Sequence, residues 1–167
     1  MSILRKLAIL GSVVLAFAAT AYAADQTKAK QSASAVQVEL TGAGDTQIPN
    51  EFRYAIYEQV VDHIEKGNAF KNVYRTGDRR AKDAADLVTI RTTVDKFTEG
   101  SQTKRELTTV LGWTKVDVNV VVADKSGNSL LEQKITGKIR FRGDNLKVTE
   151  DIGKRIAKLL GENFAAK

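Results

Sequence analysis

The stretch KVDVNVVVADKSGNSLLEQKITGKIRF, residues 115–141, decides the fold of this chain. Apolar and polar residues alternate in its first half, which is the period of a strand with one buried face. The apolar residues there are Val116, Val118, Val120 and Val122. In the second half one side collects Leu131, Ile135, Ile139 and Phe141. The composition of Asp124-Lys125-Ser126-Gly127-Asn128 suits a tight turn between them, so the stretch predicts a long antiparallel hairpin.

Three more strands are predicted upstream of this hairpin. The clearest places four residues on one face: Val88, Ile90, Thr92 and Val94. A second alternates Val36, Val38 and Leu40 with polar residues, and a short one runs from about Phe70 to Tyr74. A single helical turn is predicted at Ala81–Ala85. Each long strand is apolar on one side only, so the sheet needs a cover on that side.

Two amphipathic helices supply the cover. The first is predicted to be capped by Asn50 and stopped at Gly67, with an apolar stripe formed by Phe52, Ile56, Val60 and Ile64. The second begins at about Leu146, with a stripe formed by Val148, Ile152, Ile156, Leu159 and Leu160. The sequence therefore predicts an α+β two-layer sandwich, in which a mainly antiparallel sheet of four to five strands carries both helices on one face, in the order β-α-β-β-β-β-α.

The amino terminus has the pattern of a secretory signal peptide over residues 1–23. Arg5 and Lys6 precede an apolar run, Leu7 to Ala19, that is shorter than the roughly 20 residues of a spanning helix. Small residues at Ala21 and Ala23 predict cleavage between Ala23 and Ala24. We therefore expect a periplasmic or secreted protein with a flexible leader at 24–34, a single domain at 35–167, and no transmembrane span.

Composition limits the chemistry and the partners of the mature chain. No cysteine is present, which excludes disulfides, a cysteine nucleophile and a lipid anchor on cysteine. Loss of Arg5 and Lys6 with the signal lowers the formal net charge from +6 to +4. An excess this small, spread along the chain, does not favour nucleic-acid binding.

No catalytic, cofactor-binding or metal-binding residue is expected. His63, the only histidine, lies next to the apolar stripe of the first helix and is interpreted as edge-packed or solvated. The turn at 124–128 lacks the spacing of a calcium loop. Gly42-Ala43-Gly44 is read as a turn, and adjacent Glu150 and Asp151 as acids that stabilise the start of a helix. The chain is therefore expected not to be an enzyme.

Two surfaces remain as candidates for binding. Arg79, Arg80 and Lys82 form the densest basic run, and Arg140 and Arg142 end a strand; together they would form an anion-binding patch. The second candidate is the sheet face away from the helices, where Trp113 and Val121 stand among polar residues, the alternative being two isolated exposed hydrophobes.

The order of several short motifs resembles the bacterial envelope family called domain of unknown function 4410. The motifs are Phe70-Lys71-Asn72-Val73, Ala85-Asp86-Leu87, Phe97-Thr98-Glu99-Gly100-Ser101 with Arg105 and Gly112, and Asp124 to Leu130. Many members of that family carry a lipid-bearing cysteine, which this chain lacks. The resemblance implies an envelope location and this fold, and it implies no catalytic residue.

The sequence thus favours an exported, non-enzymatic interaction module with an envelope protein partner and no cofactor. The alternative is a binding protein for an anionic ligand or surface, such as a lipid headgroup or an acidic polysaccharide.

Overall fold

Five strands form one mostly antiparallel sheet in a computed structural model, which describes residues 29–107, 112–139 and 144–166. Their spatial order is β3 (Asn72–Arg75), β2 (Ala35–Val38), β4 (Leu87–Thr98), β5 (Thr114–Asp124) and β6 (Ser129–Ile139). The strands β4, β5 and β6 pair antiparallel, whereas β2 pairs parallel with β3 and β4. The predicted hairpin is confirmed as β5 and β6, in which Val122 lies opposite Leu131.

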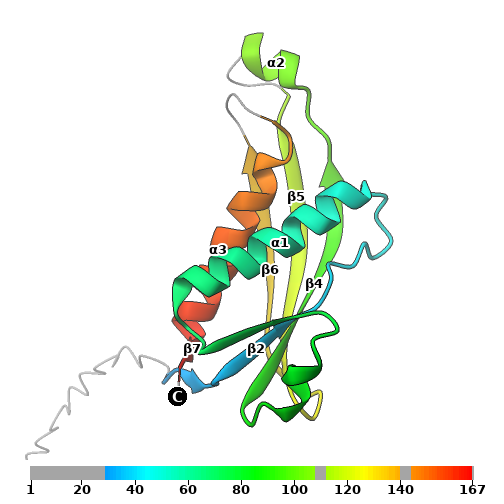
Figure 1. Ribbon diagram of the computed structural model, residues 1–167. Helices are drawn as coiled ribbons and strands as arrows, with labels where there is room; N and C mark the ends of the chain where they lie inside the picture. The colour runs from blue at the N-terminus through cyan, green and yellow to red at the C-terminus, as the bar shows by residue number, and fades with distance from the viewer. Residues whose placement is uncertain (1–28, 108–111, 140–143, 167) are drawn as a thin grey trace, which may run out of the picture.

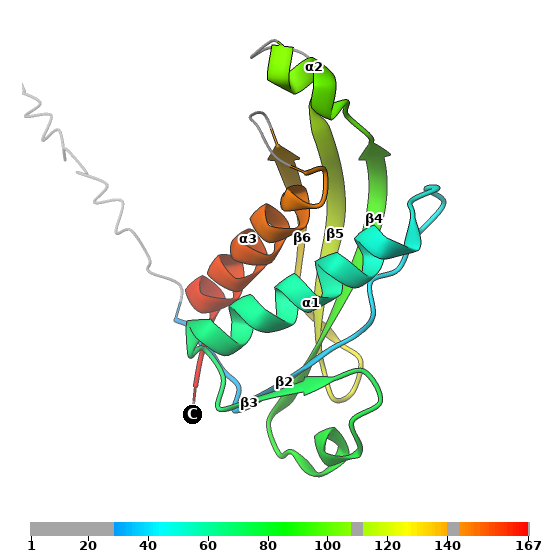
Figure 2. The same cartoon turned by 45° about the horizontal axis from the view of Figure 1, so that its top comes forward.

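Two long helices, α1 (Asn50–Gly67) and α3 (Lys147–Asn163), pack side by side on one face of this sheet (Figures 1 and 2). The α+β class and the helix positions are confirmed. The predicted order β-α-β-β-β-β-α matches the elements β2, α1, β3, β4, β5, β6 and α3. Short elements interrupt it: a 3₁₀ turn η1 (Arg79–Asp83), which overlaps the helical turn predicted at Ala81–Ala85, a helix α2 (Gln102–Leu107), and the strands β1 (Gln31–Ser32) and β7 (Phe164–Ala165). Within the described residues, no helix combines the length and apolar character needed to cross a bilayer.

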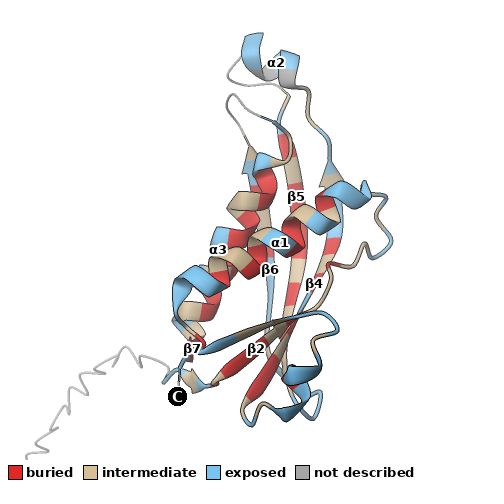
Figure 3. Ribbon diagram, in the orientation of Figure 1, coloured by how far each residue is buried: buried red, intermediate tan, exposed pale blue. Residues whose placement is uncertain are grey.

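The core fills the space between the helices and the sheet (Figure 3). All four valines that defined the hairpin are fully buried: Val116, Val118, Val120 and Val122. The two predicted helix stripes are buried as well. Leu131 and Ile139 on β6 are only half-buried, and Phe141 lies outside the described residues.

The predicted flexible leader is wrong from Gln31 onward. A two-residue strand β1 (Gln31–Ser32) pairs parallel with β7 (Phe164–Ala165) at the end of the chain. The next amide, Ala33 N, donates to Ala165 O at 3.2 Å, and Ala33 is fully buried. Small and polar residues show no apolar period, so this pairing with a distant segment leaves no local signal.

The ends of α1 also differ from the prediction. Asn50 is not the cap: it is the first helical residue, and Pro49 before it makes no side-chain hydrogen bond to the helix. Asn50 Oδ1 instead accepts from Arg53 Nη1 at 3.2 Å. At the other end Asn68, rather than Gly67, takes the left-handed conformation at φ 52° that ends the helix.

A bulge in β4 shifts its alternation. The register with β5 slips between Val94 and Lys96, so Asp95 is the extra residue. Phe97 consequently returns to the helix side, where its ring centroid lies 4.8 Å from that of Phe52 on α1. The bulge therefore adds an aromatic pair to the core and directs Asp95 to the opposite face, where it pairs with Lys134.

Candidate interaction surface

The sheet face away from the helices is polar and crossed by ion pairs. Arg91 of β4 pairs with Glu39 at 2.9 Å, and Lys134 of β6 pairs with Asp95 at 2.8 Å. Between them, Asn119 Nδ2 donates to Glu132 Oε1 at 2.9 Å. Alternation of side chains along three neighbouring strands brings these groups onto one face. This face presents paired charges rather than a continuous apolar surface.

The best-protected acid on this face is Asp117 of β5, which is only 9% exposed. Its carboxylate accepts from Thr136 Oγ1 at 2.6 Å and from Lys115 Nζ at 2.8 Å. Burial is the largest single influence, and it raises the pKa of Asp117. The hydrogen bonds from Lys115 and Thr136 and the charges of Lys115 and Lys134 together outweigh burial and hold the pKa below its ordinary value of 3.8.

Asp117→Asn is expected to lower the free energy of unfolding by about 1–2 kcal/mol near neutral pH. Because the folded-state pKa is depressed, the charged carboxylate stabilises the fold above pH 4 or so, and this contribution is lost as the pH falls through the folded pKa. Urea unfolding at a series of pH values should show the difference from wild type shrinking toward acid. Asp45→Asn, at an exposed loop position, serves as the control. A difference that grows toward acid would contradict the assignment.

Trp113 and Val121 do not combine into one apolar patch. Trp113 is 39% exposed and stands just before β5. Val121 is half-buried, with Arg91 opposite it on β4 and Glu132 opposite it on β6. Eight residues of extended strand separate the two side chains by about 26 Å. The two therefore belong to different parts of the surface.

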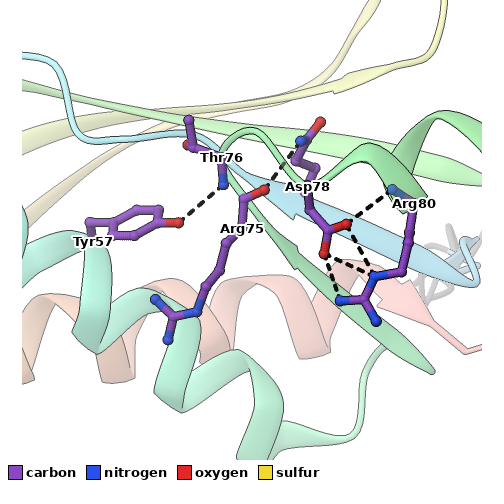
Figure 4. A network of polar contacts seen from close by, with 6 residues as sticks. Tyr57, Arg75, Thr76, Asp78 and Arg80 are labelled. Carbon is purple, nitrogen blue, oxygen red and sulfur yellow. Dashed lines mark hydrogen bonds and ion pairs between the residues drawn. The ribbon is translucent and has the colours of Figure 1, made fainter.

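Of the three basic residues at η1, only Arg80 has an ion-pair partner among the described residues (Figure 4). Arg80 is held by Asp78, with Nη2 2.7 Å from Oδ2, and its guanidinium lies 5.8 Å from the Tyr74 ring centroid. Nearby, the Tyr57 hydroxyl accepts from Thr76 N at 3.1 Å, which ties the turn before η1 to α1. Arg80 therefore already has an ion-pair partner in its own turn, although its side chain is exposed.

The other two members of the run are available. Within residues 29–107, 112–139 and 144–166, the side chains of Arg79 and Lys82 make no hydrogen bond or ion pair, and both are exposed. They line a hollow of about 340 Å³ between η1 and the sheet, with Ala81 and Leu87 as its apolar part. Arg140 and Arg142 lie outside the described residues, so the predicted joint patch stays a prediction.

The remaining sequence candidates are structural where the structure describes them. Asp124 Oδ1 accepts from Ser126 N and Asn128 N at 2.8 and 2.9 Å, which closes the β5–β6 turn. On α3, Glu150 pairs with Lys154 and Asp151 with Arg155, each one turn away. The prediction of a turn at 124–128 is confirmed, whereas only Glu150 lies in the first turn of α3 and Asp151 follows that turn.

His63 and the glycine turn also have structural surroundings. His63 is half-buried on α1, and its Nε2 is enclosed with no hydrogen-bond partner in the described part of the chain. Gly44 has φ 52°, while Gly42 forms an isolated parallel bridge to Thr93 of β4. The described residues contain no group of three or more His, Asp or Glu side chains arranged to hold a metal ion.

The sequence favours binding through the open sheet face or a strand edge but does not identify the edge strand, and the structure shows that β6 is one. Pairing to β5 uses one side of this strand, and its other side is the end of the sheet. A groove of about 250 Å³ separates that edge from α3, lined by residues 133–136 of β6 and by Arg155, Lys158, Leu159 and Glu162 of α3. Only the strand order, which the sequence leaves open, reveals that β6 is an edge.

Comparison with known proteins supports the fold and no more. Neither the known protein families nor the curated protein sequences give a match. Among solved structures, the PelC dodecamer from Paraburkholderia phytofirmans matches with a TM-score of 0.58 at 16% identity, over 80% of this chain and 89% of that chain. A single-residue variant of the same PelC, solved in another crystal form, matches at 0.57 and 18% identity, over 80% and 90%.

A Xanthomonas campestris protein of domain of unknown function 330 also matches, with a TM-score of 0.49 and 12% identity over 80% of this chain and 82% of that chain. At these identities the chain shares an architecture with PelC. Membership in domain of unknown function 4410 stays a prediction.

Proposed function

We propose that this protein is an exported, non-enzymatic interaction module that works by assembling with other protein in the bacterial envelope. The single observation that carries the proposal is the surface itself: a charged sheet face that ends in an exposed edge strand beside a groove. Such edges bind other chains through main-chain hydrogen bonds.

Two further facts support it. The amino-terminal pattern is that of an export signal, with cleavage expected after Ala23. The fold is shared with PelC, a protein that crystallises as a dodecamer. On the open face Glu39, Asp95 and Asp117 pair with arginine or lysine, and on α3 Glu150 and Asp151 do the same, which is the arrangement of structural charges rather than of a general acid and base.

The test combines location with assembly in the source bacterium. A carboxy-terminally tagged full chain should appear in the periplasm or the medium with the mass of residues 24–167 plus the tag. In-cell cross-linking should give discrete larger species, and the same assembly should be recovered without cross-linker at high salt, because apolar and main-chain contacts resist screening. Intact precursor in the cytoplasm, or only uncross-linked monomer, would contradict the proposal.

Binding of an anionic ligand at η1 is the second candidate, favoured by Arg79 and Lys82, two cations that the described residues leave unpaired over their shared hollow. Retention on anionic vesicles should then fall with salt and fall again in Arg79→Ala/Lys82→Ala. Retention that is equal in the variant and the wild type would remove this candidate.

A further inference from the structure

The outer side of β6 has free main-chain groups. The amide of Lys138 donates outward to Asp151 Oδ2 of α3, at 3.2 Å. Because main-chain groups alternate sides along a strand, the N–H and C=O of Glu132, Lys134 and Thr136 point to the same outer side. In the described residues these groups make no hydrogen bond there. Asp151 closes one end of the edge, and the middle stays open.

The middle of the edge is uncovered on both faces of the sheet. Glu132, Gln133 and Lys134 are three consecutive exposed residues. Gln133 shares its side with Leu131 and Ile135, which face the helix layer, yet α3 leaves it exposed. None of the residues that the structure describes therefore covers this position against an added strand.

We infer that a second copy of this chain occupies the edge, with β6 pairing antiparallel to β6 of the other copy about a two-fold axis at Gln133. In that register Glu132 of each copy lies opposite Lys134 of the other, so Lys134, which pairs with Asp95 in its own copy, gains a second carboxylate neighbour, twice on the open face. On the helix side Leu131 lies opposite Ile135, again twice. This inference rests on the proposed function, since it names the surface through which the module assembles.

Neighbouring registers are less favourable for reasons visible in the same strand. Placing the axis at Lys134 sets Lys134 opposite itself, and placing it at Glu132 sets Glu132 opposite itself; like charges directly opposite destabilise a pair. Placing the axis at Ile135 brings Glu132 opposite Lys138, whose amide already bonds to Asp151. The self-complementary register at Gln133 is the one that uses the open amides and alternates the charges.

The groove beside α3 fits the same partner. Its apolar floor comes from Ile135 and Leu159, which are 7% and 8% exposed. An incoming β6 would direct its own Leu131 and Gln133 toward this side, so an apolar side chain would meet the apolar floor. Self-pairing therefore covers the groove as well as the edge.

A charge exchange tests the pairing in the purified mature protein. Sedimentation from micromolar to millimolar concentration should show a dimer, or a multiple of one. Glu132→Lys should raise the dissociation constant about tenfold or more, Lys134→Glu should do the same, and the double variant should restore it to within a few-fold. Glu65→Lys, the same charge change at an exposed position on α1, should have no effect.

A single cysteine then tests the register, because the chain has none of its own. Directly opposite residues that do not exchange hydrogen bonds have Cα atoms about 4.5 Å apart, within the reach of a disulfide. Gln133→Cys should therefore form a disulfide-linked dimer under mild oxidation, whereas Ser129→Cys should not.

A monomer at all concentrations would overturn the inference, even if cross-linking to another envelope protein upholds the proposed function. An oligomer that neither Glu132→Lys nor Lys134→Glu weakens would overturn it as well, as would equal cross-linking at positions 129 and 133.

Discussion

Phe52→Ala is expected to lower the free energy of unfolding by about 3–5 kcal/mol, a large share of the total stability of a domain of this size. Phe52 is 2% exposed on α1 and packs on Phe97, which the β4 bulge turns toward the helices. Truncation removes the burial of one ring, breaks the aromatic pair and leaves a cavity between the two layers.

Urea unfolding followed by circular dichroism measures this effect. Tyr54→Ala is the matched control, because Tyr54 is two residues away on the same helix but 57% exposed. We expect its change to stay within about 0.5 kcal/mol. Equal losses in the two variants would show that α1 does not pack on the sheet as described.

Gly153→Ala is expected to destabilise the protein by about 2 kcal/mol or more. A Cβ at Gly153 would lie 2.7 Å from Gln59 O and 2.8 Å from Gln59 C, where α3 crosses α1. Both contacts are to backbone, which cannot rotate away, so the helices must separate. This cost exceeds the gain of up to about 1 kcal/mol that Ala normally brings to a helix interior.

Gly161→Ala on the same helix is the matched control. Its Cβ would meet nothing within 4 Å, so helix propensity alone acts and stability should rise by about 0.5–1 kcal/mol. Thermal unfolding of both variants should therefore give shifts of opposite sign. Two stabilised variants would contradict the close crossing of α1 and α3.

The sequence correctly predicted the strands and helices in which apolar residues recur at every second position or at every third to fourth position, because those residues are buried. The four valines of β5, the strand at 88–94 and the α3 stripe were identified this way and are buried. The turn at Asp124 was identified from residues that act within a few positions of themselves. Two of the five residues of the predicted anion-binding patch, Arg140 and Arg142, lie outside the described residues, so that patch stays a prediction.

Tertiary structure decided which elements became neighbours. Two pairings join segments that are far apart in the sequence: Gln31–Ser32 with Phe164–Ala165, and β2 with β4 in parallel. The strand order also leaves β6 at an exposed edge of the sheet. Gly153 and Gly161 look alike in the sequence, yet only one meets another backbone. The apolar period of a helix or strand shows which of its faces is buried. It does not show which other element packs on that face, because that depends on the packing of the whole chain.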